Sequence, residues 1–220
     1  MARKTTFSQD DVVQAALSVL EAEGAQAVTA RRVADALGAS TAPVYSNYAN
    51  MDDLMDAVRS RVGDMILDYC RRPWSDDSFL SMGLGFMKFC IAHPRLFRAI
   101  YCDGTSRRCT NAHVDKTLLG DLDQHPILKD LPQDHREELL FQTSVYTLGI
   151  ATTVVSGIWP DPDPDVLESW LRSVGGLLVR AAMESAGLPL TADLDNSLGT
   201  FVVPWRGSLS GHGQEESHED

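Results

Sequence analysis

The 220-residue sequence has little cysteine and no excess of positive charge. Its cysteines show no C-x-x-C spacing, so reduced buried thiols are expected in preference to disulfides or a metal site. The 19 Lys and Arg against 31 Asp and Glu give a formal net charge of −12. This balance excludes a wholly basic nucleic-acid coat and a polybasic membrane binder, although one positive face could still contact DNA. The four cysteines are Cys70, Cys90, Cys102 and Cys109.

The sequence also lacks the short motifs of common enzyme chemistries. It has no G-x-S-x-G, no glycine-rich phosphate loop and no H-E-x-x-H. Asp161, Asp163 and Asp165 alternate with prolines, but the glycine and distal glutamate of a calcium loop are missing. No catalytic residue, metal or cofactor is therefore expected, and an enzyme remains only an alternative interpretation.

Long apolar runs are scarce as well. No signal-peptide core follows Met1. The stretch from Leu139 to Pro160 has no charged residue and is long enough to span a bilayer, but hydroxyl and amide side chains interrupt it. It is better interpreted as a helix buried on several sides by protein. We therefore expect no membrane partner and a cytoplasmic location.

The apolar residues recur with helical periodicity nearly throughout, and no run alternates convincingly as a strand would. The pattern predicts an all-α protein. Capping residues, glycines and prolines divide the helices. The longer predicted helices cover residues 8–24, 29–37, 40–48, 50–70, 76–92, 134–159 and 165–185, with a non-helical corner at 160–164.

These helices fall into four regions along the chain. The pattern groups residues 1–50 as an N-terminal helical domain, with two short helices over 29–48. Residues 51–72 are expected to form a linking helix, and 73–186 a C-terminal helical domain. The end, 187–220, is rich in Gly, Ser, His and Glu and is expected to be a flexible tail.

Two short helices meeting at a glycine carry the functional signal. Ala34 is small where the helices would cross, and Gly38 can take the left-handed conformation that reverses the chain. Ser40 can cap the second helix, and Pro43 costs little in a first turn. This layout is typical of a helix-turn-helix, whose second helix can reach base edges in a major groove.

At this point the sequence resembles the TetR family of transcriptional regulators. The resemblance covers Ser8 to Val58, and the fragment from His93 to Arg98 resembles the ligand domain of many members. It implies a three-helix DNA-binding head, a linking fourth helix, and a helical domain that dimerises and holds an effector. A repressor released from a palindromic operator by a small molecule is the implied function.

The resemblance also implies roles for individual residues. Thr29 would cap the first helix of the motif and touch the DNA backbone, and Arg31 would lie near phosphate or base. Tyr45 occupies the aromatic position that contacts phosphate. The recognition surface would thus contain Thr29, Arg31, Ser40, Thr41, Ala42, Pro43, Tyr45 and Asn47.

The chain departs from the family pattern in the same region. Met51 stands where members carry a lysine, which removes one phosphate contact, and Thr41-Ala42 replaces a Lys-Gly start of the recognition helix. Residues 1–50 carry a net charge of −1 and the remainder −11. The head is therefore the better part for DNA, with a modest electrostatic contribution. A helical adaptor with a weakened DNA head remains a second alternative.

The C-terminal half is expected to hold an effector pocket and a dimer interface. Surplus aromatic surface on facing helices predicts an apolar cavity for a hydrophobic or aromatic small molecule, with Thr147 or His113 as polar contacts. Gly149, Gly157 and Gly175 would permit close helix approach in a twofold homodimer. The predicted pocket residues are Phe86, Phe89, Cys90, Phe97, Tyr101, Tyr146, Ile150 and Trp159.

Overall fold

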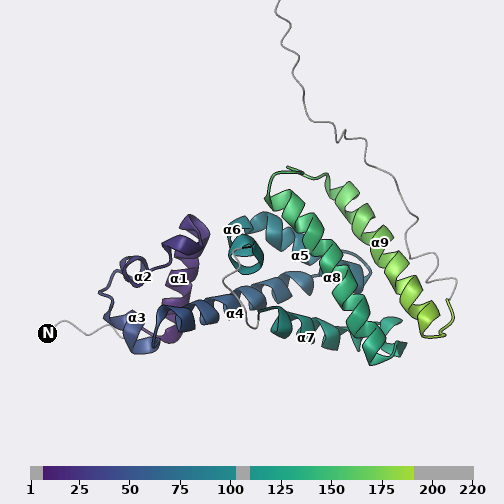
Figure 1. Cartoon of the computed structure of the whole chain (residues 1–220), viewed down its shortest axis with the longest axis horizontal. Helices are drawn as coiled ribbons and strands as arrows, with labels where there is room; N and C mark the ends of the chain where they lie inside the picture. The colour runs from purple at the N-terminus through teal and green to yellow at the C-terminus, as the bar shows by residue number, and fades with distance from the viewer. Residues whose placement is uncertain (1–6, 103–109, 191–220) are drawn as a thin grey trace, which may run out of the picture.

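The structure is a computed structural model that describes residues 7–102 and 110–190. Every regular element in these ranges is helical, as the sequence predicts. A small head of three helices lies at one end, and the long helix α4 leaves it to enter a larger helical body (Figure 1). The head contains α1 (Gln9–Glu23), α2 (Ala30–Leu37) and α3 (Ala42–Asn47), and α4 spans Met51–Cys70.

Side-chain caps begin the helices of the head where the sequence predicts them. Ser8 and Asp11 form a reciprocal capping box at α1. The Thr29 side chain accepts from the Arg32 N–H at 3.3 Å, and Asn50 accepts from the Asp53 N–H at 2.9 Å. Each cap satisfies a backbone donor that has no partner inside its helix. The starts of α1, α2 and α4 are therefore confirmed.

The body contains α4 and five further helices, of which α5 and α7 pack directly on α4. Helix α5 lies against α4 and α8, while α7 packs on α4 and α9 packs on α8. In Figure 1, α8 and α9 lie side by side on the side of the body away from the head. The helices are α5 (Ser78–Ala92), α6 (Pro94–Phe97), α7 (Thr110–Leu122), α8 (Gln133–Val155) and α9 (Pro164–Ser185).

Two predicted boundaries were wrong at the α8–α9 corner. Helix α8 ends at Val155 and not at Trp159, because Gly157 takes a φ of +80° and turns the chain. Helix α9 begins at Pro164, which was placed outside it. Proline fits the first helical position, where its missing N–H would have no partner. The Asp163 side chain accepts the Asp165 N–H at 2.8 Å and caps this start.

The structure shows the surroundings of the cysteines and whether any described helix could cross a membrane. Cys70 and Cys90 are buried free thiols; burial raises the pKa of Cys70 to about 12, which makes it unreactive. Cys102 is exposed, and Cys109 lies outside the described residues, as does most of the predicted tail. None of the described helices is both long and apolar enough to cross a membrane.

Candidate functional site

The reversal between α2 and α3 forms the centre of the head. Gly38 adopts a left-handed conformation with a φ of +64°, and the Ala39 N–H bonds back to the Ala34 carbonyl at 3.0 Å. Val33 and Val44 are fully buried and pack both helices onto α1. Ala34 is also buried. These contacts hold α3 at a defined angle to α2, as a helix-turn-helix requires.

The outward face of this motif is polar, aromatic and uncovered. Tyr45 on α3 is 57% exposed and belongs to the surface, not to the core. Thr41 and Ala42, at the start of α3, are exposed as well. Arg31 has no ion-pair partner among the described residues, whereas Arg32 pairs with Glu23. Arg31 is therefore the cation of this motif that is free to meet a phosphate.

Three residues near this face make contacts within the protein that the sequence did not predict. Ser40 does not occupy the cap position of α3: Thr41 does, without a side-chain hydrogen bond, and the Ser40 hydroxyl is 3.4 Å from the Ala42 N–H. The Asn47 amide donates to the Pro43 and Phe7 carbonyls at 2.9 and 3.2 Å. These hydrogen bonds link α3 to Phe7, two residues before α1. Met51 packs against the core.

A polar contact joins the head to the body at the end of α1. His93, which precedes α6, pairs with Glu21 through Nδ1, and its Nε2 lies 3.4 Å from the Tyr69 hydroxyl on α4. The Arg95 guanidinium donates to the Glu21 carbonyl at 3.0 Å. This contact involves two residues of the 93–98 fragment. A movement of α6 would consequently be transmitted to the head.

The body encloses a cavity of about 220 Å³ between α4, α5, α7, α8 and α9. Apolar side chains form most of its wall. Thr147, which the sequence predicts as a polar residue of the pocket, is one of the lining residues. Its volume exceeds that of an engineered cavity of ~150 Å³ that accommodates benzene. The cavity can therefore hold a small organic molecule.

Five of the eight predicted pocket residues, and His113 as a predicted polar contact, are absent from the cavity wall. Phe86, Tyr101 and Tyr146 line it. Phe89, Cys90 and Phe97 do not, because they are fully buried in the core between α5, α4 and α6. Ile150 and Trp159 are also absent from the wall; Trp159 follows α8 and packs on Trp170 with ring centroids 4.9 Å apart.

Sequence reasoning missed most of the remaining wall. Met82 lies one helical turn and Phe79 two turns before the predicted residue Phe86, but a helix with apolar residues on several sides does not indicate which side meets a cavity. The acidic residues Asp77 and Asp115 gave no signal at all. Among the described residues, no group of three or more His, Cys, Asp or Glu could hold a metal ion.

The head, the single connecting helix and the hollow helical body together define a helix-turn-helix protein with a separate cavity-bearing domain. Residues 12–58 match the family model described as "Bacterial regulatory proteins, tetR family". A curated relative, the uncharacterized HTH-type transcriptional regulator Rv0681 of Mycobacterium tuberculosis, is 30% identical over 103 residues, 45% of this chain. The match spans about half of that relative, 47% of its length.

Solved structures share the whole fold. The TetR regulator SCO7222 of Streptomyces coelicolor superposes with a TM-score of 0.62 at 16% identity, covering 81% of this chain and 98% of that one. A TetR variant of Acinetobacter baumannii in complex with minocycline superposes with a TM-score of 0.57 at 17% identity, covering 82% and 98%. Residues 12–58 thus match the N-terminal domain of the tetR family of bacterial regulatory proteins, and the rest of the described chain shares the fold of solved TetR structures.

Proposed function

We propose that this chain is a sequence-specific, DNA-binding transcriptional regulator. The observation that carries the proposal is the uncovered face of α3, where exposed Tyr45 stands beside Thr41 and Ala42 on a helix held rigidly by buried valines. Such a helix can enter a major groove while neighbouring groups meet phosphates. The family match over 12–58 supports the same function. The protein would act in the cytoplasm on a palindromic operator.

The decisive experiment is an electrophoretic mobility shift with the DNA upstream of the protein's own operon. We expect retardation that an unlabelled copy of the same DNA competes away and random DNA does not, because base contacts add to the phosphate contacts. Since the head is nearly neutral, retardation should weaken as salt rises, but less than for a basic head. No retardation at low salt would favour the adaptor or the enzyme.

The regulator is proposed to be a homodimer through α8 and α9. Phe141 and Val145 on α8 and Leu177 on α9 are large apolar residues left exposed. A Cβ added at Gly149 on α8 would meet nothing within 4 Å, so this glycine faces open space. An apolar surface with room for close approach fits a twofold, self-complementary interface.

Light scattering tests this interface. The parent chain should have twice the monomer mass at micromolar concentration, and Leu177→Glu should shift it to the monomer, because two buried like charges would meet near the twofold axis. Ile91→Glu is the matched control, since Ile91 is 47% exposed and Leu177 49%, but Ile91 lies on α5. A monomeric parent, or equal effects of both variants, would contradict the proposal.

An effector is proposed to act by shifting the population of two conformations. A ligand in the cavity must favour a conformation that does not fit DNA, or it changes nothing. The cavity touches α4 at Ile66 and Cys70, and α4 begins directly after the recognition helix. Spreading the body helices would swing α4 and move the two heads out of register with successive grooves, roughly 34 Å apart. Repression released by a small molecule follows from this arrangement.

A further inference from the structure

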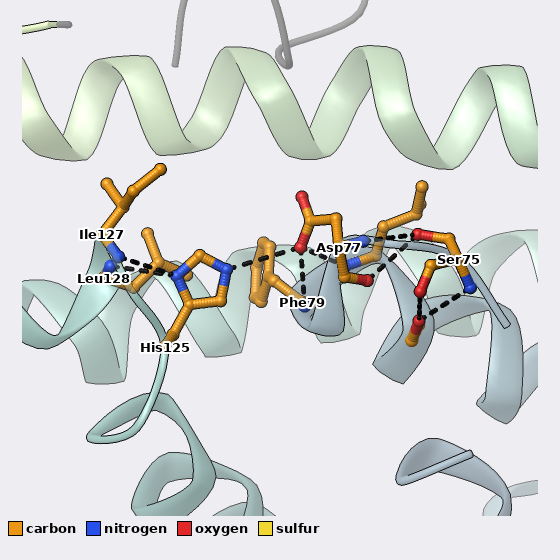
Figure 2. Close-up of polar contacts among 8 residues, drawn as sticks. Ser75, Asp77, Phe79, His125, Ile127 and Leu128 are labelled. Atoms are coloured by element: carbon orange, nitrogen blue, oxygen red, sulfur yellow. Dashed lines mark hydrogen bonds and ion pairs between the residues drawn. The ribbon is translucent and has the colours of Figure 1, made fainter. Parts of the chain in front are cut away.

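The polar groups of the cavity restrict which molecules it accepts. Asp77 caps α5, and its Oδ1 accepts from the Phe79 and Leu80 N–H groups at 2.8 and 3.2 Å. The His125 Nε2 lies 3.4 Å from the same oxygen. Figure 2 shows all of these interactions converging on one carboxylate oxygen, while the other oxygen of Asp77 has no partner among the residues drawn. That residue lines the cavity.

The His125 ring is held by hydrogen bonds at both nitrogens. Its Nδ1 accepts the N–H groups of Ile127 and Leu128 at 3.2 and 3.1 Å, which turns Nε2 toward Asp77 (Figure 2). His125 is only 8% exposed, which keeps water from replacing these bonds. The position of the Asp77 carboxylate at the cavity is therefore fixed by His125 and by the start of α5.

The carboxylate of Asp77 stays ionised. Burial raises its pKa, but the hydrogen bonds from His125 and from the Leu80 and Phe79 N–H groups outweigh burial and hold the pKa below its usual value. A negative charge thus borders an apolar cavity. A charge in such surroundings is costly unless an opposite charge or donors meet it.

A second carboxylate lines the cavity from α7. Asp115 has no hydrogen-bond or ion-pair partner among the described residues; the residue is exposed at the cavity edge, while desolvation of its carboxylate raises the pKa of that group. Among the described lining residues the one cation is Arg172, and its guanidinium is already bonded to Glu168 at 2.7 Å. In this described part of the wall the uncompensated charge is therefore negative.

We propose that the cavity binds an amphipathic organic cation, with a protonated amine against the carboxylates of Asp77 and Asp115 and an aromatic or aliphatic body on the apolar wall. Phe86 and Tyr101 form an edge-to-face pair in that wall, with ring centroids 5.6 Å apart. Aromatic faces attract cations as well as apolar groups. The proposal names the chemical class of the ligand. It rests on the proposed function only where it calls that ligand the effector of a regulator.

Isothermal titration calorimetry on the full chain without DNA tests the ligand class. The probes are phenylbutylamine, phenylbutanol and phenylbutyrate, which share one apolar body and differ in charge. We expect the amine to bind at least about tenfold more tightly than the alcohol, since hydrogen bonds between charged groups exceed neutral ones by that amount. The carboxylate should bind least. Equal binding of the three, tighter binding of the carboxylate, or no binding would overturn the proposal.

Variants assign the effect to the cavity. Asp77→Asn keeps a good helix cap but removes the charge, and should reduce the affinity for the amine about tenfold while leaving the alcohol unchanged. Asp115→Asn should act in the same direction. Asp68→Asn is the matched control, because Asp68 lies exposed on α4 outside the cavity wall. Unchanged amine binding in folded Asp77→Asn and Asp115→Asn, checked by circular dichroism, would refute the assignment.

The two proposals fail separately in these experiments. Amine binding without any DNA retardation would keep the ligand class and reject the regulator. Specific DNA retardation without a preference for the amine would keep the regulator and reject the ligand class.

Discussion

Replacing Tyr45 by alanine should reduce the affinity for operator and random DNA alike, by about tenfold or more. The side chain is exposed on α3 and does not belong to the core. A phenol that donates to a phosphate contributes the free energy of a hydrogen bond to a charged group, about 1.5–3 kcal/mol. Because every sequence has the same phosphates, the loss should not depend on the sequence.

Fluorescence anisotropy with operator and random duplexes measures both affinities. Tyr45→Phe separates the hydroxyl from the ring and should show most of the loss. Changes at Thr41 or Ala42, at the start of the same helix, should alter base preference instead. If Tyr45→Ala binds both duplexes as the parent does, this side chain has no role at the DNA backbone.

Replacing Gly85 by alanine should destabilise the body strongly, by about 1–3 kcal/mol or more. A Cβ at Gly85 would lie 2.2 Å from the carbonyl oxygen of Tyr69 and 2.7 Å from the Cα of Cys70. These are backbone atoms of α4, so no side-chain rotation can relieve the clash. The Tyr69 carbonyl also accepts the Trp74 indole N–H at 2.7 Å, and displacing α4 would strain this bond.

Thermal unfolding followed by circular dichroism provides the measurement. A chain of this size should lose roughly 2–4 °C in Tm for each kcal/mol. Gly83→Ala is the matched control on the same helix: its Cβ would make an ordinary contact with Leu171 at 3.8 Å. That variant should be unchanged or slightly stabilised, because alanine favours a helix over glycine. Equal losses of Tm would show that the α4–α5 approach is not the cause.

The DNA-binding head was largely predictable because its signals are local. A cap at Thr29 or Asn50 acts on a backbone donor three residues away, and the turn at Gly38 depends on its own φ. Each can be identified within a short window of sequence. The exposure of Tyr45 was also predicted, because the family resemblance places it at a position that contacts phosphate.

The ligand cavity was less predictable for a geometric reason. Phe86 and Phe97 look equivalent in sequence, and their rings are neighbours with centroids 6.3 Å apart, yet Phe86 meets the cavity and Phe97 is fully buried. The difference depends on how α5 and α6 are rotated against α4. Apolar residues on several sides of these helices leave that rotation undefined.

The sequence by itself determined the helical class and the starts of α1, α2 and α4, because hydrophobic periodicity and capping operate over a few residues. Only the tertiary structure decided which side chains enclose the cavity and gave that cavity its charge. Asp77 and His125 are 48 residues apart and meet at 3.4 Å only after α5 and the loop following α7 have packed. No local pattern encodes a contact of that range, since it arises from the summed packing of several helices.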